Sequence, residues 1–365
     1  MNCPFCNHLE LKEVIFPFPS FRHSDFKILS RSSAKIQCRN CLNIFNNQTK
    51  TVESDIKDIY KNDEYFIVKK THYISFENSN SNENVSVYKA RARFLKEYLP
   101  MRRPVLLDIG CLDGKMLLEF DQIYESAQLH GFDVNPKIES IFPRNDNFYF
   151  WSEKLSKITR QFDAIIVANV IQYIPDLNQF LSQLKKLLKP NGFVFIEITD
   201  IVTNPYVLLY GDQMIYYSET VLENIFNSSG FKFSVCKNNW ANRNTAGIAV
   251  IEKVKHEYKQ GAILYSSLSY FQDVKKKIEA VEHGGRIGVL GSTINAAFIN
   301  FLLKGENSFF VDENISRVGD EFYGKKIMHP MQLKDSDLVI LPYKETGERI
   351  KKKFVNKYRG TFICV

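Results

Sequence analysis

The segment that most constrains the fold is 105–114, with the sequence Val-Leu-Leu-Asp-Ile-Gly-Cys-Leu-Asp-Gly. Residues 104–109 form an apolar run that predicts a buried strand of a parallel sheet, and the apolar spacing of 115–124 predicts a helix. Gly110 and Gly114 therefore lie where a strand becomes a helix, which is where open α/β sheets bind ligands. Their spacing is neither G-x-G-x-x-G nor a P-loop, so it favours neither a dinucleotide nor a P-loop phosphate ligand.

Strands and helices alternate downstream of this turn. A second short strand ends in Asp133, and a carboxylate at that place can accept hydrogen bonds from both hydroxyls of a ribose. The later segments are a buried strand with its following loop, an amphipathic helix, another strand and two strand-like segments joined by a polar turn: 162–176, 177–188, 193–198, 231–237 and 246–254. The last two segments predict an antiparallel hairpin, which a plain doubly wound dinucleotide domain lacks.

These motifs, in this order, resemble the class I S-adenosylmethionine (SAM) methyltransferases over residues 100–255. The resemblance implies an α/β fold with a Rossmann-like seven-stranded sheet. It also implies a SAM site formed by five residues: Asp108, Gly110, Gly114, Asp133 and Asn169. Asp108 would hold the loop or the amino group of the methionine part, and Asn169 would line the pocket floor. Leu112 stands where that family has a small or polar residue, but Gly110 can still approach the ligand, so we expect SAM to bind.

Four of the seven cysteines form two C-x-x-C pairs, at Cys3, Cys6, Cys38 and Cys41. Paired thiolates on tight turns are the arrangement that closes a tetrahedral zinc site, and reducing conditions inside a cell disfavour disulfides. A site with four sulfur ligands has no open position for water. The predicted Zn²⁺ ion is therefore structural and folds a small N-terminal module that lacks a core of its own.

Length and composition predict several domains. A chain of 365 residues, 44% of them apolar, suits two or three domains. We expect four segments: a zinc-binding module (1–50), a connector and helix (51–99), the SAM domain (100–255) and a C-terminal Rossmann-like α/β domain (256–365). No apolar run is long enough for a signal or a membrane span, so we expect a cytoplasmic protein with no membrane partner. The net charge of +7 comes from Lys and Arg spread along the chain, which does not favour nucleic acid as a partner.

The three-part organisation resembles one family, the sugar C-methyltransferases that act on nucleotide-linked deoxysugars. The likeness is carried by the cysteine pairs and by five further segments: 108–114, 169–176, 312–314, 324–327 and 338–343. It implies that the small-molecule substrate is a nucleotide sugar, bound between the SAM domain and the C-terminal domain.

The residues expected for catalysis depart from that family. The family's Glu-His pair after strand five corresponds here to Asp212 and Gln213, and Tyr173 stands where relatives often carry a His. C-methylation needs a base that removes a carbon-bound proton, and Gln has no ionisable group. The candidate catalytic residues that remain are Asp212, Tyr216, His72 and Tyr73. An oxygen acceptor is therefore as well supported as a carbon acceptor.

Two other functions are consistent with the sequence. A zinc-ribbon RNA methyltransferase would use the N-terminal cysteines, but the scattered positive charge and the C-terminal domain count against it. A catalytically inactive SAM-binding or nucleotide-binding protein would fit the changes at Leu112 and Gln213. The favoured hypothesis is a SAM-dependent methyltransferase that acts on a nucleotide-linked or glycan-precursor sugar, by C- or O-methylation.

Overall fold

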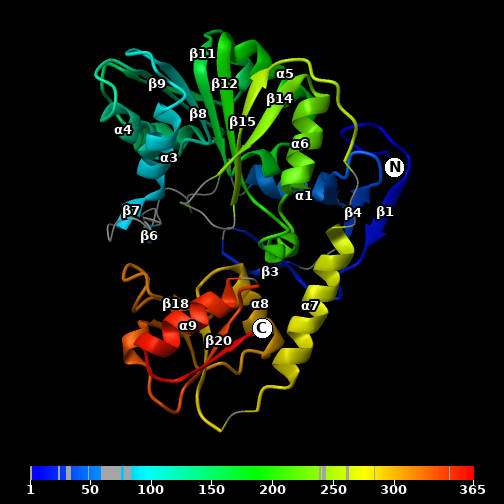
Figure 1. Cartoon of the computed structure of the whole chain (residues 1–365), viewed down its shortest axis with the longest axis vertical. Coiled ribbons are helices and arrows are strands. Elements are labelled where there is room, and N and C mark those ends of the chain that lie inside the picture. Colours follow the sequence, from blue (N-terminus) through cyan, green and yellow to red (C-terminus); the bar gives the residue numbers. More distant parts are fainter. Residues whose placement is uncertain are drawn as a thin grey trace. The chain divides into compact units, whose positions relative to one another are not determined.

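A computed structural model describes residues 2–23, 25–29, 34–47, 49–58, 75–77, 84–237, 240, 244–259, 263–282, 284–344 and 346–365. The chain forms two compact units (Figure 1, coloured along the chain). The first comprises Met1–Glu13, Ala34–Asp200 and Asp212–Gly261, and the second comprises Val14–Ser33, Ile201–Gly211 and Ala262–Val365. Each unit thus collects segments from several parts of the chain, whereas the boundaries predicted from the sequence follow chain order.

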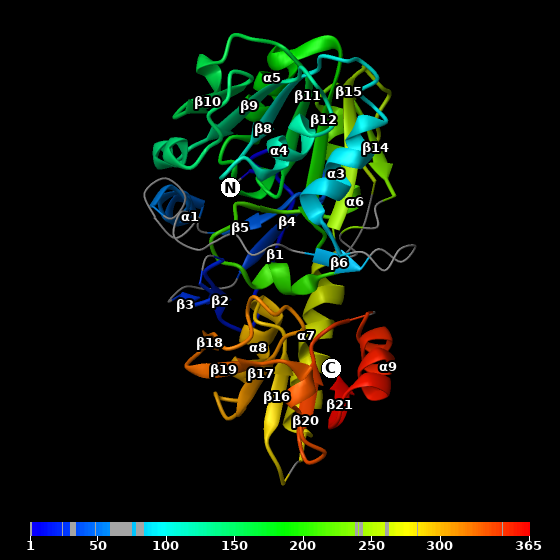
Figure 2. The same cartoon turned by 90° about the vertical axis from the view of Figure 1, so that its left-hand side faces the viewer.

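A seven-stranded sheet forms the centre of the first unit, in the order β10-β9-β8-β11-β12-β15-β14 (Figure 2). Its strands are β8 (Val105–Ile109), β9 (Gln128–Asp133), β10 (Phe148–Ser152), β11 (Phe162–Ala168), β12 (Leu188–Thr199), β14 (Phe231–Cys236) and β15 (Asn244–Ile251). The strands from β10 to β12 in this order run parallel, and β15 is antiparallel to both β12 and β14. The predicted class I methyltransferase sheet with a terminal antiparallel hairpin is confirmed.

Polar caps set where several helices of this unit begin. The helices and 3-10 turns are α3 (Val87–Lys96), α4 (Lys115–Asp121), α5 (Leu177–Leu187), α6 (Glu219–Ser228), η2 (Pro136–Ser140), η3 (Leu155–Lys157) and η4 (Ile171–Tyr173). The side chains of Ser86, Asp176 and Ser218 accept hydrogen bonds from first-turn N–H groups of α3, α5 and α6. In α5 the buried residues Leu177, Leu181 and Leu184 recur at helical spacing, so one face of this helix packs into the core.

A strand from far along the chain completes the sheet of the cysteine module. That sheet has the order β1-β4-β5-β13, with β1 (Leu11–Val14), β4 (Lys35–Cys38), β5 (Ile44–Asn46) and β13 (Ile215–Tyr216). Helix α1 (Thr49–Ile56) follows β5 in the chain, and a hairpin of β6 (Ser75–Glu77) and β7 (Asn84–Ser86) comes next. β13 pairs antiparallel with β5, which places Ile215 opposite Phe45. The module therefore shares backbone hydrogen bonds with the segment that follows β12.

The second unit contains a six-stranded sheet in the order β18-β19-β17-β16-β20-β21 (Figure 2). Its strands are β16 (Ile287–Leu290), β17 (Phe309–Val311), β18 (Glu321–Phe322), β19 (Lys325–Met328), β20 (Leu338–Leu341) and β21 (Thr361–Cys364). All neighbours are parallel except β18 and β19. The other elements are α7 (Ile263–Glu279), α8 (Ile294–Leu302), α9 (Gly347–Lys357) and η6 (Pro330–Gln332). The predicted C-terminal Rossmann-like α/β fold is confirmed.

Two segments from earlier in the chain belong to the core of this second unit. They carry β2 (Ser20–Phe21), β3 (Ile28–Leu29) and η5 (Pro205–Leu209). Phe16 and Phe18 each pack edge to face on Phe271 of α7, with ring centroids 5.8 Å apart, and Tyr206 packs on Phe271 at 5.6 Å. Because aromatic side chains bury large apolar areas, these contacts fix both segments to α7. Among the helices in the described ranges, none is long and apolar enough to cross a membrane.

A buried ion pair joins α3 to the methyltransferase sheet. Glu197 of β12 is fully buried, and its carboxylate accepts hydrogen bonds from Arg91 Nε (2.8 Å), Trp240 Nε1 (2.8 Å) and Asn244 Nδ2 (2.6 Å). Burial alone would raise the pKa of Glu197, but the charge of Arg91 and these donors hold that pKa below its ordinary value. The carboxylate is therefore ionised and links three separate parts of the chain.

We expect Glu197→Ala to lower the free energy of unfolding by about 3–5 kcal/mol, because it leaves the charge of Arg91 buried without a partner. Urea unfolding followed by tryptophan fluorescence measures this, since both tryptophans of the chain lie in the first unit. Glu252→Ala is the control, because Glu252 pairs with Lys232, both half exposed, and such a pair contributes less than about 1 kcal/mol. Equal losses in the two variants would contradict the role assigned to Glu197.

Candidate functional site

The turn after β8 requires glycine at two positions. Gly110 and Gly114 both adopt left-handed backbone conformations, with φ of 77° and 71°. A Cβ on Gly110 would lie 2.4 Å from Val170 Cγ2, and a Cβ on Gly114 would lie 2.6 Å from Pro143 Cδ. Side chains are thus excluded at both positions by backbone conformation and by space. Leu112, the departure from the family pattern, also has a left-handed backbone (φ 45°), so the turn keeps its path with a bulkier residue.

Asp133 ends β9 beside this turn. Its Oδ1 accepts a hydrogen bond from the N–H of Asn135 at 3.0 Å, and its Oδ2 accepts one from the N–H of Leu112 at 3.4 Å. Burial raises the pKa of Asp133, and the two N–H groups oppose that rise only in part. The carboxylate is therefore oriented by the backbone of the same turn that contains the two glycines.

Asp108 lies in β8 opposite Gly131 of β9, two residues before Asp133. Burial raises the pKa of its carboxyl to about 7, an effect that the charge of Arg91 opposes and that of Asp133 increases. Within the part of the chain that the structure describes, no group donates a hydrogen bond to this carboxylate. A buried carboxylate without a donor is suited to a cationic group on a ligand.

Asn169 follows β11, in a left-handed conformation with φ of 56°, and its N–H donates to the carbonyl of Glu197 at 2.7 Å. The strand order reverses between β8 and β11, and this is the topological switch point where open parallel sheets bind ligands. The structure thus brings Asp108, Gly110, Asp133 and Asn169 together at the carboxyl ends of β8, β9 and β11. A contact of these residues with SAM remains a prediction.

Asp212 and Tyr216, two of the predicted catalytic residues, are fully buried. Asn46 Nδ2 donates to the Tyr216 hydroxyl at 2.7 Å and to the carbonyl of Gln213 at 2.5 Å. Lys35, also fully buried, donates from Nζ to Asn46 Oδ1 at 2.6 Å and lies 4.7 Å from the centre of the Tyr216 ring. Sequence reasoning missed Lys35 and Asn46, because lysine and asparagine are ordinarily exposed and neither residue belongs to a recognisable motif.

Gln213 and Tyr173, which replace the histidines expected from the resemblance, lie side by side. Gln213 Nε2 donates to the Tyr173 hydroxyl at 3.5 Å. Neither side chain titrates near neutral pH in its unperturbed state, so this pair does not supply a base. The other two predicted catalytic residues, His72 and Tyr73, lie outside the described residues.

The four N-terminal cysteines form one cluster. Their sulfurs all lie within 4.8 Å of one another, and two sulfur pairs, Cys3–Cys41 and Cys6–Cys38, are 3.6 Å apart. A tetrahedral zinc ion with Zn–S bonds of about 2.3 Å would separate its sulfurs by about 3.8 Å. The spacing of the sulfurs therefore fits one zinc ion held by all four.

The protonation of this cluster also fits a divalent cation. The hydrogen bond with Cys3 lowers the pKa of the Cys38 thiol, whereas the hydrogen bond with Cys3 raises that of Cys41. The Cys38 thiol therefore ionises more readily than the thiols of Cys3 and Cys41, whose pKa values are raised. Four thiolates in this space need a cation among them, which a zinc ion provides.

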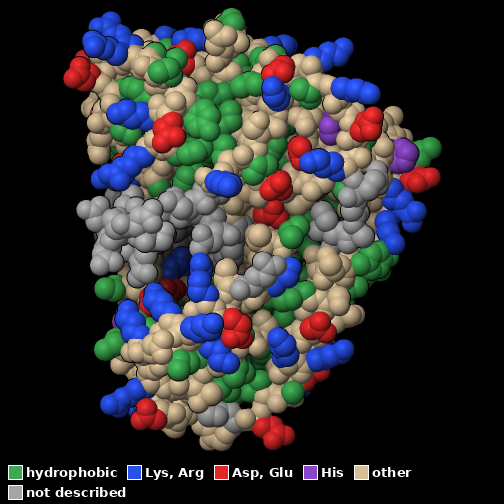
Figure 3. Space-filling view, in the orientation of Figure 1, with side chains coloured by type: hydrophobic (Ala, Val, Ile, Leu, Met, Phe, Trp, Pro, Cys, Tyr) green, Lys and Arg blue, Asp and Glu red, His purple; other side chains and the backbone are tan. Residues whose placement is uncertain are grey.

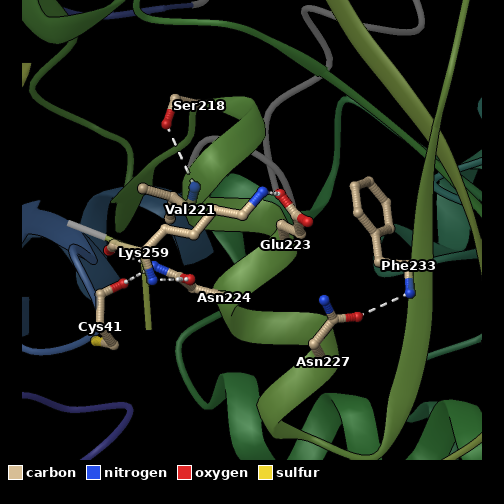
Figure 4. A network of polar contacts seen from close by, with 8 residues as sticks. All are labelled: Cys41, Ser218, Val221, Glu223, Asn224, Asn227, Phe233 and Lys259. Carbon is tan, nitrogen blue, oxygen red and sulfur yellow. Dashed lines mark hydrogen bonds and ion pairs between the residues drawn. The ribbon is translucent and has the colours of Figure 1, made fainter. Parts of the chain in front are cut away.

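Helix α6 fixes the cysteine cluster to the methyltransferase sheet. Figure 4 shows Asn224, whose Nδ2 donates to the Cys41 carbonyl at 3.1 Å and whose Oδ1 accepts from the N–H of Lys259 at 3.0 Å. Asn224 is fully buried, and Tyr258 packs against the cysteines from the same segment as Lys259. The cluster is therefore attached to the domain that carries the glycine turn.

Comparison with known families identifies that domain. Residues 64–234 match the family model described as a methyltransferase domain, a range that includes the glycine turn and excludes the four cysteines and the C-terminal sheet. Together with the strand order, this match shows that the chain carries a class I SAM-dependent methyltransferase domain. The matching family model names methyl transfer and no acceptor, so the acceptor is a separate question.

Parts of the chain are similar to individual methyltransferases. The ubiquinone biosynthesis O-methyltransferase of Pelagibacter ubique is 27% identical over 135 residues, which are 32% of this chain and 55% of that protein. The demethylmenaquinone methyltransferase of Chlorobaculum parvum is 24% identical over 174 residues, 46% of this chain and 69% of that protein. The chain thus spans little more than half the length of the first relative. A solved SAM-dependent methyltransferase from Clostridium acetobutylicum has 13% identity over 46% of this chain and 93% of its own, with a TM-score of 0.38.

We expect the purified protein to carry about one zinc ion per chain, and Cys38→Ser to lose it, because three thiolates leave the site open to water and chelators. Metal analysis of protein purified without chelator measures the content. Cys236→Ser is the control, since Cys236 lies on β14, outside the cluster, and its loss leaves the zinc content unchanged. Protein without zinc, or equal zinc in both variants, would rule out the four-cysteine site.

We expect SAM affinity to rise by up to about tenfold between about pH 6 and pH 7.5, because Asp108, with a pKa of about 7, must be ionised to hold the ligand's ammonium group. The raised pKa has the opposite effect on stability: ionising Asp108 costs folding free energy as pH rises toward 7. Calorimetry across this pH range measures the affinity. The slope should be lost in Asp108→Asn and retained, at weaker affinity, in Asp133→Asn. An unchanged slope in Asp108→Asn would assign the titration to another group.

Proposed function

We propose that this protein is a SAM-dependent methyltransferase that methylates a sugar carried on a nucleotide or on another glycan precursor. The observation that carries the methyl-transfer part is the pair of buried carboxylates, Asp108 and Asp133, set around Gly110 at the switch point of a seven-stranded sheet. A carboxylate at the end of β9 suits the ribose hydroxyls of SAM, and one in β8 suits its ammonium group.

The acceptor class rests on the likeness to sugar C-methyltransferases, which extends beyond the methyltransferase domain into the C-terminal unit. That unit adds a second parallel sheet, an arrangement common among nucleotide-binding folds. On the face drawn in Figure 3, Lys and Arg side chains are interspersed with Asp and Glu. The Lys and Arg residues are spread along the sequence rather than gathered in one segment, which favours a small-molecule acceptor over RNA.

Gln213 makes a hydroxyl oxygen the better acceptor atom. In methyl transfer an oxygen lone pair forms the new bond to the methyl carbon, and the pair of the broken carbon–sulfur bond stays on sulfur, which leaves S-adenosylhomocysteine. The hydroxyl proton must leave as the methyl arrives, and Asp212, the acid beside Gln213, is the nearest carboxylate in sequence to accept it. The alignment of oxygen, methyl carbon and sulfur supplies most of the rate, so one weak base suffices.

We expect Asp212→Asn to lower turnover by at least about tenfold while SAM affinity stays the same, the pattern of a group that acts in the transition state. Because Asp212 is fully buried, the thermal midpoint of each variant is measured with the rate. Asp163→Asn is the matched control, because Asp163 pairs with Lys189 and accepts the N–H of Val105 at the amino end of the sheet. Comparable losses of rate in both variants would remove Asp212 from the chemistry.

Labelled SAM, offered with a panel of nucleotide sugars with and without RNA, tests the acceptor directly. Label transferred to a sugar nucleotide supports the proposal. Transfer to RNA alone, or to no acceptor while SAM still binds, contradicts it and supports an RNA methyltransferase or an inactive SAM-binding protein.

A second measurement separates oxygen from carbon acceptors. We expect the protein not to exchange the α-proton of a keto-sugar nucleotide with deuterated solvent, because Gln213 supplies no base. Exchange observed by NMR would show that a carbon acid is deprotonated and would return C-methylation to first place.

A further inference from the structure

The turn after β16 in the C-terminal sheet has the same backbone geometry as the turn after β8 at the predicted SAM site. Gly291 follows β16 as Gly110 follows β8, and both have left-handed backbones, with φ of 90° and 77°. The N–H of Gly291 donates to the carbonyl of Val311 at 2.7 Å, as the N–H of Gly110 donates to the carbonyl of Phe132 at 2.7 Å. In each sheet the glycine after the first parallel strand thus hydrogen-bonds to the second parallel strand.

An aspartate stands at the end of the second strand in both sheets. Asp312 follows β17, one residue past the pairing of Leu290 with Val311, as Asp133 stands one residue past the pairing of Ile109 with Phe132. Asp312 Oδ1 accepts the N–H of Asn314 at 2.9 Å, the counterpart of the 3.0 Å bond between Asp133 and Asn135. In both places the carboxylate faces a glycine turn at a strand end, where a ribose can be held.

A buried amide at the switch point of the C-terminal sheet has an unused acceptor. The strand order reverses between β16 and β20. Asn295, in the first turn of α8 after β16, is 2% exposed, and its Nδ2 donates to the carbonyl of Pro342 after β20 at 2.8 Å. The amide therefore lies in the crevice between these strand ends, and among the described residues no group donates to its Oδ1. A buried acceptor left open at this place indicates a ligand or water that donates to it.

The cation beside this turn has no carboxylate partner among the described residues, whereas the cation beside the turn after β8, Lys115, is paired with Asp113 at 2.7 Å. Arg317 Nη1 donates to the hydroxyl of Ser292 at 2.9 Å and to its carbonyl at 3.3 Å, and the same hydroxyl donates to Asp312 Oδ2 at 3.2 Å. Arg317 is half-buried and forms no ion pair with the other residues that the structure describes. Its remaining guanidinium donors are thus placed beside the turn and suit a phosphate group.

We propose that the C-terminal unit contains a second nucleoside site, which binds a ribonucleoside diphosphate. Asp312 accepts the ribose hydroxyls, Arg317 and the first-turn N–H groups of α8 hold the phosphates, and Asn295 Oδ1 accepts a donor on the ligand. No side chain caps α8, so its N–H groups are available. The site lies wholly within the second unit, and its existence does not depend on which acceptor the methyltransferase domain uses.

Calorimetry with protein saturated with S-adenosylhomocysteine tests this site while the first nucleoside site is filled. We expect UDP or ADP to bind with about one equivalent per chain. Asp312→Asn should weaken this binding by at least about tenfold and leave S-adenosylhomocysteine affinity unchanged, whereas Asp133→Asn should do the reverse. Arg317→Gln, a change at a half-buried position, should weaken nucleotide binding and reduce its dependence on salt.

A ligand analogue separates binding from a merely structural role of Asp312. The native protein should bind the 2′,3′-dideoxy nucleoside diphosphate more weakly than the nucleoside diphosphate. This loss of affinity should equal the loss that Asp312→Asn causes with the nucleoside diphosphate. The Asp312→Asn variant should bind the two ligands equally well. Additive losses, no binding up to about 1 mM nucleotide, or binding that S-adenosylhomocysteine abolishes would each overturn the proposal.

Sugar nucleotides distinguish the two sources of such a ligand. If UDP-glucose binds this site more tightly than UDP, the site holds the nucleotide part of a sugar donor or acceptor. If UDP binds at least as tightly, the site holds a free nucleotide. Either result, together with the Asp312 dependence, supports the site itself.

Discussion

The first unit depends on the buried carboxylate of Glu197. Its donors are Arg91 from α3, Trp240, which precedes β15, and Asn244, the first residue of β15, and its backbone carbonyl accepts the N–H of Asn169. Removing an ionised carboxylate from water costs several kcal/mol, and only a complete set of donors makes the charge tolerable in the core. One residue of β12 therefore fixes the helix that precedes the sheet, the antiparallel hairpin and the loop after β11 that borders the predicted SAM site.

The cysteine module is coupled to the predicted catalytic segment rather than appended to it. β13 hydrogen-bonds to β5, and the fully buried Lys35 reaches Tyr216 through Asn46. A buried ammonium group is costly unless it is hydrogen-bonded. Lys35 and its acceptor Asn46 lie on β4 and β5 of the cysteine module, so the position of this lysine depends on the fold of the module. Loss of metal would therefore disturb the segment from Asp212 to Tyr216 as well as the cysteines. A zinc ion in this cluster would therefore act on the predicted catalytic segment indirectly, through the fold of the module.

The features predictable from the sequence are those that depend on local pattern. Apolar strands, the turn residues Gly110 and Gly114, and the cysteine spacing all follow from short-range rules, and parallel topology then places Asp133 beside the turn. The unpredicted features are contacts between distant segments, such as β13 with β5 and Phe16 with Phe271. The sequence pattern predicts only that such residues are exposed or buried. It does not predict which distant segment they contact. The burial of Asp212 falls in the same class.

The turns after β8 and β16 have similar backbones but different charges around them. This difference explains how they would select different ligands. Asp108 in β8 and Asp133 at the end of β9 flank the turn after β8, whose own carboxylate, Asp113, is paired with Lys115. The nearby Arg91 is committed to Glu197, so its charge only moderates the pKa of Asp108. That environment favours a ligand with a sulfonium and an ammonium group. The turn after β16 has one carboxylate, and Ser292 links it to Arg317, whose positive charge offsets it. The ribose can be held in the same way at both turns, but among the described residues Lys115 beside the first turn is paired with Asp113, while Arg317 beside the second has no carboxylate partner and suits a phosphate. On this proposal the same backbone plan would form a nucleoside site twice, and the side chains around each turn would decide the charge of the group that the nucleoside carries.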